Sequence, residues 1–179
     1  LPAKITGSIV ELGAGNGELA ELTKDRIKKL TLVDIKPEKN IIQADFNRKL
    51  PLRPGQFSGA ISLEVIEHLI NHELFLKEVY RILKPKGWLI ISTPNIAWWG
   101  YRLFILLGRP PKKEGYHLRF FTHYSLTRLL KQSGFTIIQS NSFTTLPLIN
   151  RYLPKPIYPS VKFWPNLLAQ DLVYLCRKK

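Results

Sequence analysis

Short, fully apolar runs alternate along this chain with segments whose apolar residues recur at helical spacing. Five runs have the length and β-branched content of buried strands: 9–12, 30–33, 41–44, 57–63 and 88–92. Helical spacing is found at 18–29, 72–83 and 123–133. Two further strands are expected at 135–139 and 171–176. This order predicts an α/β fold with a doubly wound, mostly parallel seven-stranded sheet and an antiparallel strand at its end.

A glycine-rich turn follows the first apolar run. Gly13, Gly15 and Gly17 stand at alternate positions, directly before a segment with helical spacing. Glycines permit a tight turn and let a ligand approach bare backbone, and the N-terminus of the next helix offers unpaired N–H groups. The turn is therefore a candidate cofactor site, with an ordinary strand-to-helix turn as the alternative.

Two acids follow the second and third runs. Asp34 ends the second run about 20 residues after the glycines, where doubly wound folds use a carboxylate to bind two vicinal ribose hydroxyls. Asp45 follows the third run, beside Phe46. A solvated strand end is the alternative for Asp34, and a turn or helix cap for Asp45. Because carboxyl ends of parallel strands share one sheet edge, the turn and both acids predict a single crevice.

Several segments in this order resemble the class I S-adenosylmethionine-dependent methyltransferases, near the ubiquinone-biosynthesis type of the small-molecule branch. The likeness is strongest over Val10–Gly17, over Phe57–His68 with its Glu-Val-Ile-Glu-His run, and from Pro94-Asn95 through His-Leu-Arg-Phe-Phe-Thr to Gly134-Phe135. Ser58 departs from the family, which often has Asp there. The resemblance covers almost the whole chain and implies a Rossmann-like methyltransferase domain over residues 1–179.

The resemblance implies S-adenosylmethionine as cofactor. The residues that it places around the cofactor are Glu11, Gly13, Ala14, Gly15, Asn16, Gly17, Asp34, Ile35, Asp45, Phe46 and Glu64. Glu11 would orient the turn or the ammonium group, Asp34 would bind the ribose, and Asp45 with Phe46 would meet the adenine. His68 and His117 are candidate general bases, because imidazole titrates near neutrality, and Glu67 could orient His68.

Two other enzyme classes fit less well. A dinucleotide-binding Gly-x-Gly-x-x-Gly pattern needs its third glycine at Glu18, and Tyr80 with Lys84 lies too early for a nicotinamide enzyme's Tyr-x-x-x-Lys pair. His68 and His72 are four residues apart, but Glu67 precedes the first of them, so the His-Glu-x-x-His pattern of zinc hydrolases is not met. No metal is expected.

Positive charge is concentrated in the second half of the chain. The formal net charge is +14, and from residue 100 onward the acids are only Glu114 and Asp171. Such an excess is typical of proteins that meet nucleic acid, an anionic membrane or an acidic substrate, although it also serves solubility. RNA binding or RNA modification through this basic half is therefore the alternative to a small-molecule methyltransferase, although no recognised RNA-binding signature is present.

Two insertions, at about 96–121 and 144–168, are expected to meet the methyl acceptor. Aromatic residues that could wall an apolar pocket are Trp98, Trp99, Tyr101, Phe104, Tyr116, Phe120 and Phe121. Cations for its mouth are Arg102, Arg109, Lys112, Lys113 and Arg119. This mixture suits a small or lipid-like, amphipathic and anionic acceptor, with peripheral membrane contact. The alternative is that the aromatic residues only cap the sheet; the oligomeric state is not predicted.

The lone cysteine, Cys176, excludes an intramolecular disulfide and is consistent with the cytoplasm. Neither a signal peptide nor a transmembrane span is predicted, because the apolar stretch at 88–107 is interrupted by Pro94, Asn95 and Arg102. The sequence has no methionine, and a helix before Leu1 is expected to be missing.

Overall fold

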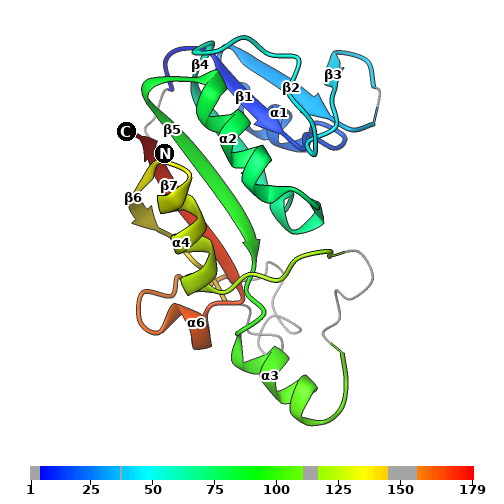
Figure 1. The fold of residues 1–179 in the computed structure, drawn as a ribbon, viewed down its shortest axis with the longest axis vertical. Helices are drawn as coiled ribbons and strands as arrows, with labels where there is room; N and C mark the ends of the chain where they lie inside the picture. The colour runs from blue at the N-terminus through cyan, green and yellow to red at the C-terminus, as the bar shows by residue number, and fades with distance from the viewer. Residues whose placement is uncertain (1–4, 37, 111–116, 145–156) are drawn as a thin grey trace.

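The computed structural model describes residues 5–36, 38–110, 117–144 and 157–179. Its strands are β1 (Ile9–Leu12), β2 (Leu30–Asp34), β3 (Ile41–Gln43), β4 (Phe57–Leu63), β5 (Leu83–Pro94), β6 (Phe135–Ser140) and β7 (Asp171–Lys178). Its helices are α1 (Glu18–Thr23), the short 3-10 helix η1 (Ile66–His68), α2 (His72–Ile82), α3 (Trp99–Leu106), α4 (His123–Gln132) and α6 (Pro165–Leu168). These elements form one sheet flanked by helices (Figure 1).

The sheet has the strand order β3-β2-β1-β4-β5-β7-β6, and β7 is antiparallel to both of its neighbours. The other pairings are parallel. The predicted seven-stranded, mostly parallel sheet with an antiparallel terminal strand is thus confirmed. After β3 the chain crosses back to the other side of β1, so the carboxyl ends of β1 and β4 flank a topological switch point.

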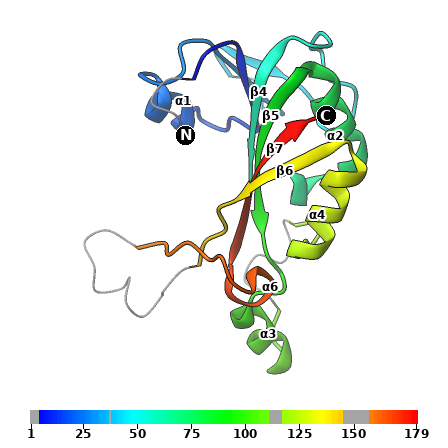
Figure 2. The ribbon, with the colours of Figure 1, turned by 90° about the vertical axis from the view of Figure 1, so that its left-hand side faces the viewer.

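Helices α2 and α4 cover one side of the sheet, while α1 lies on the other (Figure 2). Phe75, Val79 and Ile82 of α2 are buried, as are Leu126 and Leu130 of α4. Helix α4 has a capping residue at its start and a glycine at its end. Thr122 caps α4 by accepting the N–H of Ser125, and Gly134 leaves the helix at a φ of 90°.

The first helix is shorter than the sequence predicts. A helix to about Lys29 is expected, but α1 ends at Thr23, whose hydroxyl donates to the carbonyl of Leu19. The chain then turns so that Ile27 forms a parallel bridge with Ile5. Ile27 is buried with Ile5, Ile9 and Ile61 in a small core of its own. Burial of this isoleucine in that core replaces a further helical turn.

Two other differences are the start of β5 and a short helix in the second expected insertion. β5 begins at Leu83, immediately after α2, although Pro85 and Gly87 suggest a break before the strand. The four-residue helix α6 lies at the end of the insertion expected at about 144–168, of which 145–156 fall outside the described residues. Between β2 and β3 the described residues form no helix, which agrees with the shortened connection expected there.

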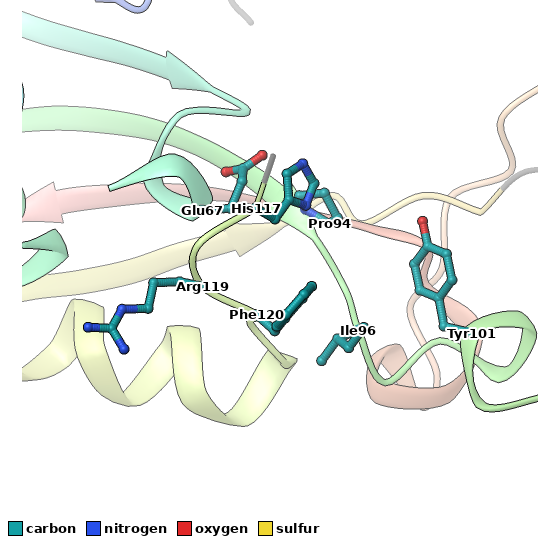
Figure 3. A pocket seen from close by; sticks show the side chains of 7 residues that line it. All are labelled: Glu67, Pro94, Ile96, Tyr101, His117, Arg119 and Phe120. Carbon is teal, nitrogen blue, oxygen red and sulfur yellow. The ribbon is translucent and has the colours of Figure 1, made fainter. Parts of the chain in front are cut away.

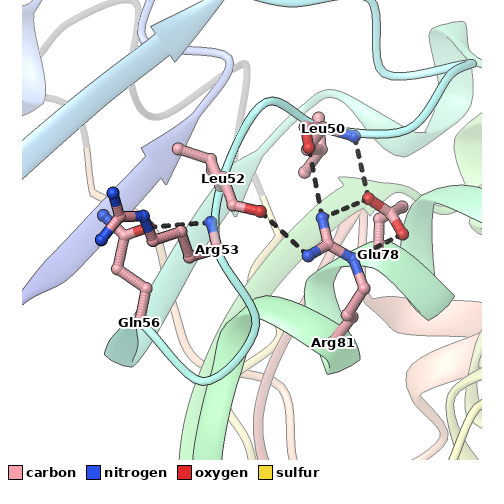
Figure 4. A network of polar contacts seen from close by, with 6 residues as sticks. All are labelled: Leu50, Leu52, Arg53, Gln56, Glu78 and Arg81. Atoms are coloured by element: carbon pink, nitrogen blue, oxygen red, sulfur yellow. Dashed lines mark hydrogen bonds and ion pairs between the residues drawn. The ribbon is translucent and has the colours of Figure 1, made fainter.

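A carboxylate–guanidinium pair fastens the segment after β3 to α2 (Figure 4). Arg81 donates to Glu78 from Nε at 2.8 Å and from an Nη at 2.7 Å. The same guanidinium donates to the carbonyls of Leu50 and Leu52, and Glu78 also accepts the N–H of Leu50 at 2.8 Å. Because the pair is largely buried and every strong bond is charge-assisted, it fixes the loop that carries Asp45.

We predict that Glu78→Gln lowers the free energy of unfolding at neutral pH by about 1.5–3 kcal/mol, because Arg81 loses an ionised partner. The hydrogen bonds of Arg81 hold the pKa of Glu78 below its ordinary value of 4.5. A depressed carboxyl pKa stabilises the fold above 4.5, and this contribution is lost as the pH falls through the folded-state pKa.

Urea unfolding at pH 7 and near pH 3 should therefore show a stability difference between parent and variant that shrinks at the lower pH. Glu73→Gln is the matched control, because Glu73 is an exposed acid on the same helix. Equal losses for the two variants at pH 7 would show that the pair does not stabilise the fold.

Candidate cofactor crevice and adjoining acceptor hollow

The glycine turn is anchored to β2. The N–H groups of Gly13 and Ala14 both donate to the carbonyl of Val33, at 2.9 and 3.1 Å. Gly13, Gly15 and Gly17 all have positive φ, at 88°, 53° and 80°. Residues other than glycine rarely adopt this conformation, which is why the turn needs glycines at alternate positions.

The glycines face different surroundings. A Cβ at Gly13 would lie 2.2 Å from Cγ2 of Val65, so this backbone packs directly against the chain that leaves β4. A Cβ at Gly15 would meet no atom within 4 Å. Gly13 thus joins the turn to the end of β4, whereas Gly15 borders open space in which a ligand can approach the backbone.

Asp34 lies beside the glycine turn, as predicted. Its Oδ2 accepts the N–H of Gly15 at 2.8 Å, and its Oδ1 accepts the N–H of Lys36 at 3.0 Å. The neighbouring Ile35 exposes 57% of its surface at the end of β2. The carboxylate is therefore held in place, and each oxygen retains a lone pair for a further donor.

Glu11 is a buried acid on β1, with 6% of its surface exposed. Its Oε2 has no hydrogen-bond partner within the described part of the chain. Burial, and then the negative charge of Asp34, raise the pKa of Glu11 to about 7. A cation placed next to this carboxyl would favour its ionised form and so oppose both causes of the shift.

The residues after β3 match the expectation only in part. Asp45 lies at the sheet edge, where its Oδ1 accepts the N–H of Asn47 at 2.9 Å and its Oδ2 pairs with Arg48 at 3.3 Å. These contacts correspond to the turn role left open above. Phe46 is buried and packs against Phe75, with ring centroids 5.6 Å apart. Little of its ring is left for an adenine, because it belongs to the core.

Glu64 occupies a strained position immediately after β4. Its φ is 55°, in the left-handed region that disfavours side chains. Ser92 of β5 supports it twice: Ser92 Oγ accepts the N–H of Glu64 at 3.1 Å and donates to Glu64 Oε1 at 2.8 Å. Strain of this kind persists where surrounding contacts over-determine it, often at binding sites.

The three predicted catalytic residues come together. One ligand atom each from Glu67, His68 and His117 lies within 4.8 Å of the others. The two imidazole rings meet edge to face, with centroids 4.9 Å apart. The N–H groups of Leu118 and Arg119 both donate to the carbonyl of Glu67, which attaches the distant His117 segment to η1.

Thr93 supports this cluster, a role that the sequence did not predict. Its hydroxyl donates to Oε2 of Glu67 at 3.0 Å, and Glu67 itself is only 1% exposed. The available signal was that β5 follows β4 in a parallel sheet, so polar residues ending β5 must lie beside those after β4. His72 lies apart from the cluster and meets the ring of Phe121 edge to face.

A small hollow of about 10 Å³, enough for one water molecule, adjoins Glu67 and His117 and is partly open to solvent. It is lined by Glu67, Pro94, Ile96, Tyr101, His117, Arg119 and Phe120 (Figure 3). Of the expected pocket wall, Tyr101, Phe120 and Arg119 are in place, and Phe121 is instead buried in the core. Tyr116, Lys112 and Lys113, as well as Glu114, lie outside the described residues.

Comparison of the sequence with known proteins identifies a family that it matches. A family model described as a methyltransferase domain matches residues 2–140. A probable S-adenosylmethionine-dependent methyltransferase of Mycolicibacterium smegmatis is 29% identical over 140 residues, which cover 72% of this chain and 52% of that protein. A ubiquinone biosynthesis O-methyltransferase of Bartonella tribocorum is 28% identical over 98 residues, covering 52% and 40%.

Solved structures agree with the fold. A Thermotoga maritima protein described as a SAM-dependent methyltransferase, possible histamine N-methyltransferase, matches with a TM-score of 0.73 and 26% identity, covering 98% of this chain and 84% of that one. A putative methyltransferase of Bacillus halodurans matches with a TM-score of 0.69 at 15% identity, covering 99% and 94%. The chain spans about half the length of the mycobacterial relative it matches.

We predict that alanine at the two glycines has unequal effects on stability. Gly13→Ala should lower the free energy of unfolding by about 2–5 kcal/mol, because a left-handed φ and a clash with Val65 add together. Gly15→Ala should cost only about 1–2 kcal/mol, since the new methyl meets open space. Urea melts of both variants measure the difference, and equal losses would contradict the geometry of the turn.

Proposed function

Because this chain belongs to the S-adenosylmethionine-dependent methyltransferases, we propose that it transfers the methyl group to a small acceptor bound beside Glu67 and His117. The observation that carries the proposal is the pair Glu11 and Asp34 at the glycine turn. One acid is buried with an oxygen that has no partner in the described residues, and the other is held by the turn itself. Both features suit a ligand that carries a cation and a diol.

In this proposal, different residues of the crevice contact different parts of the cofactor. Asp34 accepts the ribose hydroxyls, with Ile35 beside the adenine, and the carboxyl of Glu11 faces the ammonium group. The backbone from Gly13 to Gly17, including Ala14 and Asn16, lies along the methionyl part, because only glycine leaves it bare. Asp45 is the candidate for the adenine amino group, and Phe46 supports it from the core.

When bound, S-adenosylmethionine supplies a methyl group already activated on a sulfonium, so the chain need not supply a nucleophile. What the chain must do is hold the acceptor in line with the methyl and exclude water. Glu64, fixed by Ser92, lies between the crevice and the cluster in sequence and shares the sheet edge with both. The hollow beside His117 marks where the reacting group of the acceptor would lie, and the rest of the acceptor would extend outside it.

The acceptor is inferred to be a small molecule with an apolar or aromatic body and a hydroxyl group. The Tyr101 and Phe120 rings and the Arg119 guanidinium around the hollow support a partly apolar, anionic ligand. The Bartonella relative carries the name of an O-methyltransferase, which supports oxygen as the acceptor atom. As the new C–O bond forms, the hydroxyl loses its proton, and His68 and His117 are placed to receive it.

The same cluster also fits a divalent cation, which the sequence analysis did not expect. Two imidazoles and a carboxylate are a common ligand set for zinc-like ions, and the Thr93 hydroxyl orients Glu67 from behind. A general base requires only one histidine. The three ligand atoms thus make this cluster a candidate cation site, and a bound cation would polarise the acceptor hydroxyl in place of the base role of the histidines.

We predict that cofactor binding releases a proton through Glu11. At pH 6 its carboxyl, with a pKa of about 7, is mostly protonated, and an ammonium group beside it favours the ionised form. Calorimetric titration with S-adenosylmethionine in two buffers of different ionisation enthalpy should show nearly one proton released at pH 6, and a release that falls as the pH rises through 7.

Glu11→Gln should abolish this release, whereas Glu21→Gln, an exposed acid on α1, should preserve it. Binding of the cofactor with no buffer dependence in the parent protein would refute the role of Glu11. Absence of any cofactor binding would refute the proposed function itself.

We predict that Co²⁺ added to the protein develops the visible absorption of a nitrogen- and oxygen-ligated ion. His117→Ala should weaken Co²⁺ binding by about 10-fold or more, because one of three protein ligands is removed. His72→Ala is the control, since this histidine lies outside the cluster. A featureless titration of the parent protein would leave His68 and His117 with the base role alone.

RNA binding through the basic half is the remaining alternative. Crosslinking of radiolabelled S-adenosylmethionine, beside filter binding of RNA at two salt concentrations, separates it from the small-molecule function. Strong, salt-sensitive RNA retention without crosslinking would favour the alternative.

A further inference from the structure

Exposed apolar side chains gather at one end of the molecule. Helices α3 and α6 lie together beyond the carboxyl end of β5 in both views (Figures 1 and 2). The large apolar residues exposed on these two helices and the residues adjoining them in the chain are Trp99, Leu103, Ile105, Leu106, Leu107, Phe163, Trp164 and Leu168. No other end of the described structure presents a comparable set.

Helix α3 buries little of its apolar surface. Among its eight residues only Gly100 and Tyr101 are buried. A Cβ at Gly100 would lie 2.2 Å from the ring of Trp98, so the helix is seated closely on that indole. This contact with Trp98 fixes the direction of α3. At the far end of the helix, Leu106 exposes 82% of its surface.

Asn95 connects the chain that precedes α3 to α6. Its side-chain amide donates to the carbonyls of Pro165 and Ala169, at 2.9 and 2.7 Å, and its backbone N–H donates to Gln170. Asn95 is fully buried and lies four residues before α3. Because one side chain connects the start of α3 to α6, their apolar residues form one surface with a fixed shape.

The charge at this end is predominantly positive, and Asp171, directly after α6, is the nearest acid in sequence. The described segments 96–110, 117–144 and 157–170 contain no Asp or Glu. Arg102, Arg109 and Lys162 lie on or next to the exposed apolar residues. Leucine and isoleucine on a helix, tryptophan and tyrosine at its border and flanking cations are the composition of helices that lie in a membrane interface.

We propose that this end docks on the surface of an anionic lipid bilayer, with α3 lying in the interface. None of the helices in the described part of the chain has the length and apolar character needed to cross a bilayer, so the contact is peripheral. Tyr101 of α3 and Ile96 just before it also line the hollow beside His117. Docking would therefore place that hollow next to the lipid, whatever reaction it supports.

Vesicle co-sedimentation tests the proposal with two lipid compositions: phosphatidylcholine alone, and phosphatidylcholine with one third phosphatidylglycerol. The protein should sediment with the anionic vesicles at low salt and weakly with the neutral ones. Leu106→Ser should reduce partition to anionic vesicles by about 10-fold, because one fully inserted leucine is lost. Leu22→Ser is the matched control, since Leu22 has the same 82% exposure as Leu106 but belongs to α1.

The electrostatic contribution to membrane binding is tested with separate variants. Arg109→Gln and Lys162→Gln should each weaken partition by about 5-fold, while Lys29→Gln, an exposed cation near β2, should not. No sedimentation with anionic vesicles, or equal effects of Leu106→Ser and Leu22→Ser, would overturn the proposal. So would light scattering that shows Leu106→Ser dissolving an oligomer, because the surface would then join copies of this chain.

Discussion

The close approach of the glycine turn to the chain leaving β4 is the constraint on which the sites depend. A Cβ at Gly13 would stand 2.2 Å from Cγ2 of Val65, so the bare backbone of the turn touches the Val65 side chain. Val65 lies between Glu64 and the η1 helix that carries Glu67 and His68. The contact therefore sets the distance between the crevice for the cofactor and the cluster beside the acceptor hollow, and a methyl transfer depends on that distance.

The features that depend on local residue spacing could be predicted from the sequence. The strands, the glycine turn and Asp34 follow from patterns within about 25 residues, and the structure has them where they are expected. Phe46 shows the limit of such patterns, because an aromatic residue after a strand looks the same whether it packs on Phe75 or on a ligand. Only the packing of α2 against that segment decides between them.

Long-range contacts account for the remaining differences. His117 reaches Glu67 through two backbone hydrogen bonds across some fifty residues, and no spacing rule contains them. The early end of α1 has a similar origin, since the burial of Ile27 against Ile5 depends on a bridge between segments flanking β1. The sequence named His68 and His117 only as separate base candidates, and their contact depends on the fold.

The position of β7 has a consequence for how the chain can be synthesised. β7 lies between β5 and β6, although it follows both in sequence. While a ribosome is still translating residues before 171, β5 has an unpaired edge and β6 has no neighbour in the sheet. Domains fold from the N-terminus during synthesis, so the nascent chain passes through a stage in which an apolar strand edge is open to other chains. Protection of that edge by a chaperone would matter until β7 has been translated and has paired with β5.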